Sequence, residues 1–208
     1  MLTDVQKDAL TEIMNIGVGR AGSVLSELIG SMVKLHVPSV GLTSLPNLPS
    51  CLSLTGEAEL ASVRQHFSGS LDGRAVLLFP RESGNVLARQ LIGEDSDITS
   101  IDSEREEALT EVGNILLNSV LGSMSNILQH RLDYEVPQYR EGALKNLVPG
   151  VTDALNDSGE DCHVLYANAH FDIEAFRVTG NVLIVFDVAS FNQLLARVDQ
   201  MSLQTEES

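Results

Sequence analysis

The sequence predicts an α+β fold, with one domain built from two similar repeats and long helices packed on a β-sheet. Three observations lead to this prediction. A motif occurs twice, a long stretch of helical periodicity carries its Glu and Asn in each copy, and short apolar strand patterns follow. Each repeat reads helix, strand, strand, strand, helix. Such a unit buries its sheet best against its twin, so we expect approximate two-fold symmetry within a single domain spanning 1–208.

The duplicated motif is a Glu, an Asn and a Pro at constant spacing. Both copies read E-x2-N-x22-P, and each member of the second copy lies 99 residues after its counterpart (12 to 111, 15 to 114 and 38 to 137). The members are Glu12, Asn15 and Pro38, and then Glu111, Asn114 and Pro137. We expect repeat one at about 1–95 and repeat two at about 100–203. Both prolines are assigned to structure, at the exit of a strand.

The order of elements follows from periodicity and turn residues. Repeat one is expected to hold a long helix at about 3–30, strands near 33–37, 57–67 and 70–79, and a short helix near 82–92. Repeat two is expected to hold a long helix at about 103–131, strands near 132–136, 162–171 and 176–186, and a last helix at about 190–201. Thr3 and Ser103 are predicted N-caps, Ser103 with the capping-box partner Glu106. Predicted loops cover 43–53, 93–102 and 146–160.

Both long helices are expected to present their Glu and Asn on an exposed face, because residues three apart share a helix face. The predicted apolar sides hold Val5, Ala9, Ile13, Gly17, Val24 and Leu28, and Leu109, Val112, Leu116, Val120 and Ile127. The predicted polar sides hold Asp8, Glu12, Asn15, Gly19 and Ser26, and Glu107, Glu111, Asn114, Asn118 and Ser125. One E-x2-N on a solvated face means little. Its occurrence on both helices indicates a function, because solvent-facing positions change at little cost in stability.

Composition excludes several functional classes. The formal net charge of −16 argues against nucleic acid and anionic membranes as partners. No apolar run is long enough to cross a bilayer and the N-terminus does not read as a signal peptide, so the cytoplasm is the expected compartment. Cys51 and Cys162 have no CxxC spacing, and the five histidines are scattered, so neither a disulfide nor a metal site is predicted. Nucleotide-binding glycine loops and G-x-S-x-G are absent from the sequence.

The duplicated motif resembles that of the CheC/CheX/FliY family of bacterial chemotaxis phosphatases. With the acidic residue that precedes each Glu, the copies read Asp8-x3-Glu12-x2-Asn15-x22-Pro38 and Glu107-x3-Glu111-x2-Asn114-x22-Pro137. The resemblance covers nearly the whole chain, because the family's architecture is duplicated in the same way. No switch-protein domain is expected after the last helix. With two intact motifs, the chain looks most like a free-standing CheC.

The resemblance implies a substrate and a role for each motif residue. The substrate would be a phosphorylated CheY-like receiver domain, which carries its own Mg²⁺, so the chain would need no cofactor. Asn15 and Asn114 would orient the attacking water, since a carboxamide both donates to and accepts from water. Glu12 and Glu111 would pair with a receiver lysine. The expected substrate-binding residues on the same faces are Asp8, Gly19, Glu107 and Asn118.

Two other functions stay open at this point. The chain could bind a receiver domain without hydrolysing its phosphate, as an adaptor. By the same resemblance it could regulate a CheD-like deamidase. The presence of both Asn residues favours the phosphatase, and we expect a monomer.

Overall fold

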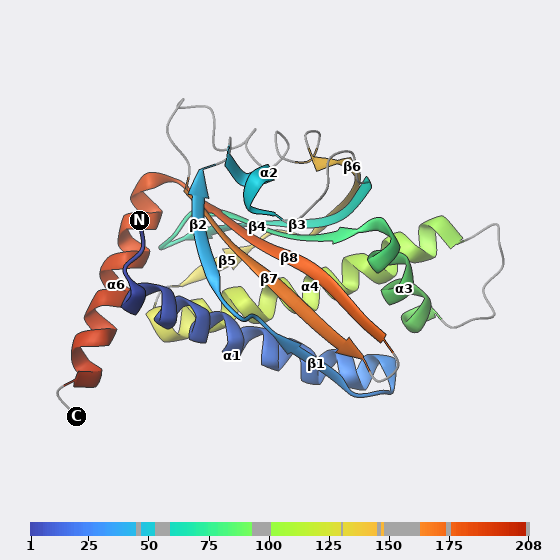
Figure 1. Ribbon diagram of the computed structural model, residues 1–208, viewed down its shortest axis with the longest axis horizontal. Helices are drawn as coiled ribbons and strands as arrows, with labels where there is room; N and C mark the ends of the chain where they lie inside the picture. The colour runs from blue at the N-terminus through green and yellow to red at the C-terminus, as the bar shows by residue number, and fades with distance from the viewer. Residues whose placement is uncertain are drawn as a thin grey trace.

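The computed structural model describes residues 1–44, 47–52, 59–92, 101–129, 131–144, 147, 163–173 and 176–206 (Figure 1). The first half contains α1 (Asp4–Ile29), β1 (Val33–His36), β2 (Val40–Ser44), α2 (Leu48–Cys51), β3 (Glu59–Gly69), β4 (Gly73–Pro80) and α3 (Arg81–Ile92). The second half contains α4 (Ile101–Leu128), β5 (Leu132–Tyr134), β6 (Gln138–Ala143), β7 (His163–Ile173), β8 (Phe176–Phe186) and α6 (Val188–Glu206). The predicted α+β fold is confirmed.

The two halves share one antiparallel sheet and exchange their first strands. The strand order is β1-β7-β8-β4-β3-β5, with β2 also paired to β7 and β6 also paired to β3. The short strands of each half therefore lie on the long strand of the other half, and β4 pairs with β8 at the centre. This pattern is the approximate two-fold symmetry that the duplicated motif predicts. Neither half can complete its part of the sheet alone.

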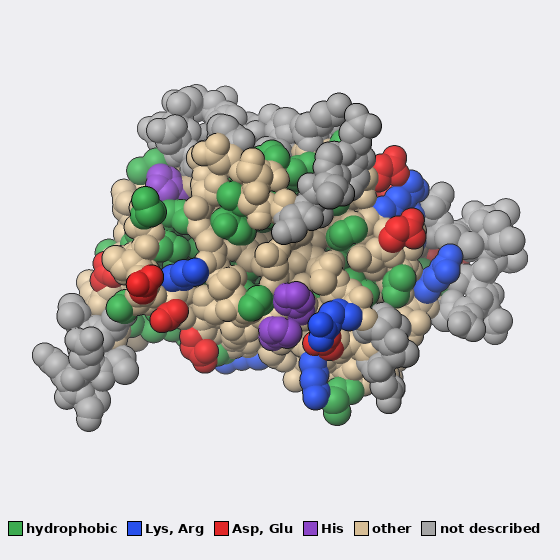
Figure 2. All heavy atoms as spheres, in the orientation of Figure 1, with side chains coloured by type: hydrophobic (Ala, Val, Ile, Leu, Met, Phe, Trp, Pro, Cys, Tyr) green, Lys and Arg blue, Asp and Glu red, His purple; other side chains and the backbone are tan. Residues whose placement is uncertain are grey.

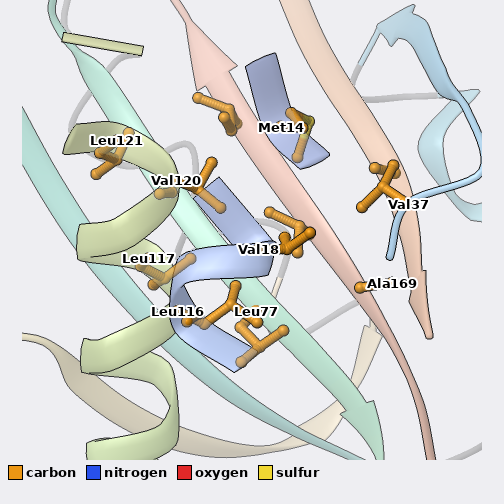
Figure 3. Close-up of a cluster of buried hydrophobic side chains, with 14 of the residues drawn as sticks. Met14, Val18, Val37, Leu77, Leu116, Leu117, Val120, Leu121 and Ala169 are labelled. Atoms are coloured by element: carbon orange, nitrogen blue, oxygen red, sulfur yellow. The ribbon is translucent and has the colours of Figure 1, made fainter. Parts of the chain in front are cut away.

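The sheet is covered on both faces. On the central strands, alternate residues point to opposite faces, as a pleated strand requires. Ala75, Leu77 and Phe79 of β4 lie in the main core, while Val76 and Leu78 lie in a smaller cluster that includes Leu48 of α2. The long helices α1 and α4 run across the main-core face (Figure 1). Figure 3 shows their buried side chains, among them Met14, Val18, Leu117 and Val120, packed over Leu77 and Ala169.

The helices α1 and α4 touch at a glycine. A Cβ atom built on Gly17 would lie 2.6 Å from the Cα atom of Val120 and 3.0 Å from the carbonyl oxygen of Ser119. The same construction on Gly19, two residues along, meets no atom within 4 Å. Gly17 is therefore required by the close approach of the helix backbones, whereas Gly19 lies on the exposed side of α1.

The predicted apolar side of α1 is partly wrong. Val5, Val24 and Leu28 are about half exposed, at 57%, 46% and 49%. The buried residues instead follow a stripe displaced around the helix: Leu10, Ile13, Met14, Gly17, Val18, Ala21 and Leu25. The stripe is displaced because α1 packs against both α4 and β1, so residues that face either neighbour are buried. On α4 the predicted apolar residues Leu109, Val112, Leu116 and Val120 are buried.

The predicted element boundaries are correct for most long elements and wrong at several short ones. Thr3 caps α1 and forms a capping box with Gln6. Ser103 is not an N-cap, because α4 begins at Ile101, so the predicted loop 93–102 also ends too late. The predicted loop 43–53 contains the end of β2 and all of α2 within its described part, and β6 was not predicted. The predicted loop at 146–160 lies outside the described residues, apart from 147, which is helical.

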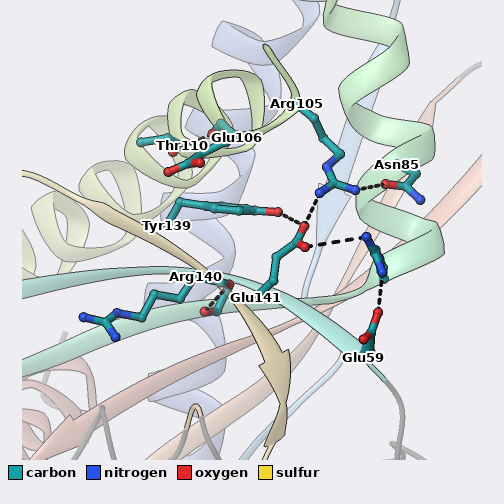
Figure 4. A network of polar contacts seen from close by, with 10 residues as sticks. Glu59, Asn85, Arg105, Glu106, Thr110, Tyr139, Arg140 and Glu141 are labelled. Carbon is teal, nitrogen blue, oxygen red and sulfur yellow. Dashed lines mark hydrogen bonds and ion pairs between the residues drawn. The ribbon is translucent and has the colours of Figure 1, made fainter. Parts of the chain in front are cut away.

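A polar network ties the two halves together beside α3 (Figure 4). Arg105 of α4 contacts Glu141 of β6 at 2.6 Å and donates a hydrogen bond to Asn85 of α3 at 3.0 Å. Glu141 also accepts from the Tyr139 hydroxyl. Burial raises the pKa of Tyr139, and the hydrogen bond to Glu141 and its negative charge raise it further. The Tyr139 hydroxyl therefore stays protonated and continues to donate at neutral pH.

Charged side chains are intermixed on the face drawn in Figure 2, with red and blue groups close together rather than gathered into one stripe. Among the helices of the described segments, none has the length and apolar character needed to pass through a bilayer. Within those segments, likewise, no three His, Cys, Asp or Glu side chains converge closely enough to hold a metal ion.

Candidate functional site

The structure places the predicted catalytic residues on the accessible parts of α1 and α4. Glu12 and Glu111 are exposed, and Asn15 and Asn114 are half-buried. The predicted substrate-binding residues differ more among themselves: Asp8, Gly19 and Glu107 are exposed, and Asn118 is half-buried. Each half thus brings an exposed carboxylate and a partly accessible carboxamide together on one helix, three residues apart.

At site one, defined by Glu12 and Asn15, the amide is bound to the protein's own backbone. Asn15 Nδ2 donates to the carbonyl oxygen of Val37 at 2.8 Å, and the Val37 N–H donates to Asn15 Oδ1 at 2.8 Å. Val37 is buried and precedes Pro38 in the turn between β1 and β2. In the first copy these two bonds explain the spacing between Asn and Pro, because Asn15 satisfies the N–H and the C=O of the residue that precedes the proline.

Other side chains of α1 hold the same pair of strands. The Val33 N–H donates to Ser26 Oγ at 2.9 Å, and the Val40 N–H donates to Thr11 Oγ1 at 3.3 Å. A Cβ atom on Gly22 would lie 3.1 Å from the carbonyl oxygen of Val33. The small residue at position 22 therefore lets α1 lie directly against β1, which brings Asn15 within reach of the strand exit.

At site two, defined by Glu111 and Asn114, the amide contacts side chains. Asn118 Nδ2 donates to Asn114 Oδ1 at 2.6 Å, and Asn114 Nδ2 lies 3.5 Å from Glu111 Oε2, at the long limit for a hydrogen bond. Val136, the counterpart of Val37, is 82% exposed. Among the described residues, the hydrogen bonds of Asn114 are made with side chains alone.

The two halves also differ at one position on each long helix. Leu121 of α4 corresponds to Gly22 of α1 at the motif offset of 99 residues (22 to 121), and the Leu121 side chain is fully buried. Gly22 lets α1 approach β1 with no side chain between them, whereas the corresponding Leu fills space in the main core. In repeat two Val136 lies in solvent, and Asn114 contacts side chains of its own helix.

The chemistry available at both sites follows from the valence of the carboxamide. An Asn side chain has two N–H donors and two acceptor lone pairs. Asn15 uses one donor and one lone pair on Val37, which leaves one of each for a water molecule. Asn114 uses one lone pair on Asn118 and directs its nitrogen toward Glu111. Either amide can bind a water molecule, and the exposed carboxylate three residues before it can pair with a cation.

Sequence reasoning missed two contributors to these sites. Gln65 of β3 is buried, donates to Asn118 and lies below site two. Its sequence signal is the alternation of the predicted strand: Gln65 lies on the same face as Val63 and Phe67, at a position that should face the core. The contact between Asn15 and Val37 has one sequence signal, which is the constant distance between Asn and Pro in both motif copies.

The two Asn residues should differ in their effect on stability. We expect Asn15→Ala to lower the free energy of unfolding by about 2–3 kcal/mol, because it leaves the buried N–H and C=O of Val37 without partners. We expect Asn114→Ala to change stability by less than about 1 kcal/mol, since it removes only side-chain contacts and Ala is the better helix former. Urea unfolding of both variants measures the difference. Equal losses would contradict this account of site one.

Solved structures of a flagellar protein and a chemotaxis protein have a similar fold. The structure resembles FliY from Thermotoga maritima with a TM-score of 0.74 and 21% identity, covering 96% of this chain and 98% of that one. It also resembles the chain in a CheX–CheY–BeF3–Mg²⁺ complex from Borrelia burgdorferi, with a TM-score of 0.52, 16% identity and coverage of 85% and 99%. At these identities the two likenesses show the fold alone.

Sequence comparison is more specific. The model of the CheC-like family matches residues 5–42, which contain the whole first motif from Asp8 to Pro38. The CheY-P phosphatase CheC of Bacillus subtilis (strain 168) is 25% identical over 196 residues, which are 93% of this chain and 93% of that protein. Together these matches confirm the resemblance to the CheC-like family that the duplicated motif predicts.

Proposed function

We propose that this protein hydrolyses the aspartyl phosphate of a CheY-like receiver domain. Asn15 and Asn114 orient the attacking water, and Glu12 and Glu111 dock the receiver through a lysine near its phosphate. The similarity to a protein named CheY-P phosphatase supports the substrate class. The observation that carries the proposal is the repeated geometry: in both halves, a carboxamide with unused hydrogen-bonding capacity lies beside an exposed carboxylate.

The reaction requires little covalent chemistry from this chain. Water attacks phosphorus in line with the bond to the receiver's aspartate, that P–O bond breaks, the water loses a proton, and inorganic phosphate and a free aspartate carboxylate result. The amide accepts a hydrogen bond from the water or donates one to it, and so holds it in line. Catalysis by positioning suits phosphoryl transfer, where orientation and charge stabilisation account for most of the rate.

The carboxylates contribute to docking. An exposed Glu pairs with a cation weakly on its own, but at an interface such a contact sets orientation and raises the association rate. An amide is also the appropriate neighbour for a phosphoryl group, since an Asp in its place would bring a negative charge toward negative oxygens. In this proposal the receiver brings its own Mg²⁺ as part of the substrate, and the phosphatase adds no metal ion.

The test is phosphate release from a CheY-like receiver kept phosphorylated by acetyl phosphate, with and without this protein. We expect release to accelerate in proportion to the amount of protein added. If the protein binds the phosphorylated receiver but does not accelerate phosphate release, the adaptor function is favoured. If the protein neither binds the receiver nor accelerates phosphate release, the proposal is contradicted. Regulation of a CheD-like deamidase is a separate prediction, tested by deamidase activity with and without the chain.

A further inference from the structure

Gln65 occupies an unusual position for a polar residue. It lies in the middle of β3, only 3% of it is exposed, and its side chain points to the helix-covered face of the sheet. Its Nε2 donates to Asn118 Oδ1 at 2.9 Å and to the carbonyl oxygen of Glu135 at 2.9 Å. Among the described residues its Oε1 has no hydrogen-bond partner. The orientation of the amide is nevertheless defined, because reversing it would turn Oε1 toward two acceptors.

These hydrogen bonds form a continuous chain, called the relay below, from the end of β5 to the exposed face of α4. The Glu135 carbonyl accepts from Gln65, Gln65 donates to Asn118, Asn118 donates to Asn114, and Asn114 points toward Glu111. Glu135 immediately precedes the exposed Val136. Gln65 therefore satisfies the Glu135 carbonyl at the exit of β5, one residue before Val136, which is the counterpart of the Val37 that Asn15 binds in repeat one.

The relay belongs to one repeat only. At the motif offset of 99 residues, Asn118 corresponds to Gly19 (19 to 118), which has no side chain. His66-Phe67 of β3 corresponds to His170-Phe171 of β7, so Gln65 corresponds to Ala169, which cannot donate a side-chain hydrogen bond. Site one has no residue at either position that could orient an amide from below.

We propose that Gln65 and Asn118 are positioning residues for Asn114, an inference that rests on the proposed phosphatase function. Gln65 donates to Asn118 Oδ1, and Asn118 is thereby oriented with its nitrogen toward Asn114. Asn118 donates to Asn114 Oδ1 and fixes the plane of a carboxamide whose last torsion otherwise has a broad preference. The nitrogen of Asn114 is thereby directed to the side of the helix where Glu111 would dock the receiver. The amide is oriented before the receiver binds, which lowers the entropy cost of the reactive arrangement.

Asn15→Ala and Asn114→Ala provide the two backgrounds that isolate each site. In each background we introduce Asn118→Ala, which removes the donor to Asn114, and separately Gln65→Met, which keeps core volume while removing the amide. Turnover of the phosphorylated receiver is measured at several receiver concentrations, together with urea unfolding of every variant. A residue that orients the amide affects kcat, whereas a residue that contacts the receiver affects KM.

With only site two intact, each substitution is expected to lower kcat about tenfold to a hundredfold with KM changed less than about twofold. The loss should be at least about fivefold larger than in the background with only site one intact. A loss of equal size in both backgrounds for Asn118→Ala, whose half-exposed position tolerates Ala, would overturn the inference, as would an unchanged kcat. If neither parent background accelerates phosphate release, the proposed function fails instead. The two failures are therefore distinct.

Discussion

The double variant Asn15→Ala, Asn114→Ala is expected to abolish the acceleration of phosphate release while receiver binding persists. Without either amide, nothing in the two sites holds water in line with the phosphorus atom, and the receiver returns to its own rate of hydrolysis. Misplacing a reacting group by about 1 Å can cost on the order of a hundredfold. Phosphate release at saturating protein, compared with and without the substitutions, measures the loss. Each single variant should keep partial activity through the other site.

The matched control replaces the two carboxylates by amides. Glu12→Gln with Glu111→Gln keeps the size of each side chain and removes its charge, so receiver affinity should fall and become less sensitive to salt. Activity at saturating receiver should largely persist. The amide variant loses turnover and keeps binding, whereas the carboxylate variant loses binding and keeps turnover. Full activity in the double amide variant would end the assignment of Asn15 and Asn114.

Stability must be measured beside activity for Asn15. Its side chain also binds the N–H and the C=O of Val37. Asn15→Ala can therefore lower activity through unfolding. Asn114→Ala carries no such ambiguity, because its partners are the side chains of Asn118 and Glu111. Assays at a temperature where both variants are folded separate the two effects.

The duplicated motif was a good predictor of the fold because it depends on features that repeat. Periodicity located the long helices, and the constant spacing located Asn and Pro on elements that the structure brings together through the Asn15–Val37 bonds. The exchange of first strands between halves was not predictable. An internal symmetry is also compatible with each half pairing its own strands, and the two arrangements are distinguished by the pairing of β1 and β2 with β7 and of β5 and β6 with β3.

The asymmetry of the two sites shows where sequence reasoning ended. Both copies have the same Glu, Asn and Pro, so the motif alone does not indicate whether the two sites are equal. The halves differ at Gly22, which lies against β1, and Leu121, which is buried in the core, and site two also has Gln65, a residue from the other repeat. A helical projection also placed Val24 and Leu28 inside, because it contains no information on which neighbour the helix packs against. Contacts between distant segments determined all three outcomes.

The largest effect on stability is expected from Gly17→Leu. A side chain at this position would meet the backbone of α4 at Val120 and Ser119, and backbone in the middle of a helix cannot move aside as a flexible side chain can. Separating α1 from α4 would also open the main core along both helices. We expect the free energy of unfolding to fall by about 3 kcal/mol, at the upper end for overpacked cores. Urea unfolding followed by circular dichroism measures the loss.

Gly19→Leu provides the matched control on the same helix. No atom lies within 4 Å of a Cβ at position 19, so the added side chain should remain in solvent. Leu is a better helix former than Gly, and the variant should gain up to about 1 kcal/mol. The two substitutions are chemically identical and two residues apart, so opposite signs can arise only from the contact between α1 and α4. Equal effects would mean that the helices do not meet at Gly17, and the sheet-covering layer that presents both Asn residues would have to be arranged differently.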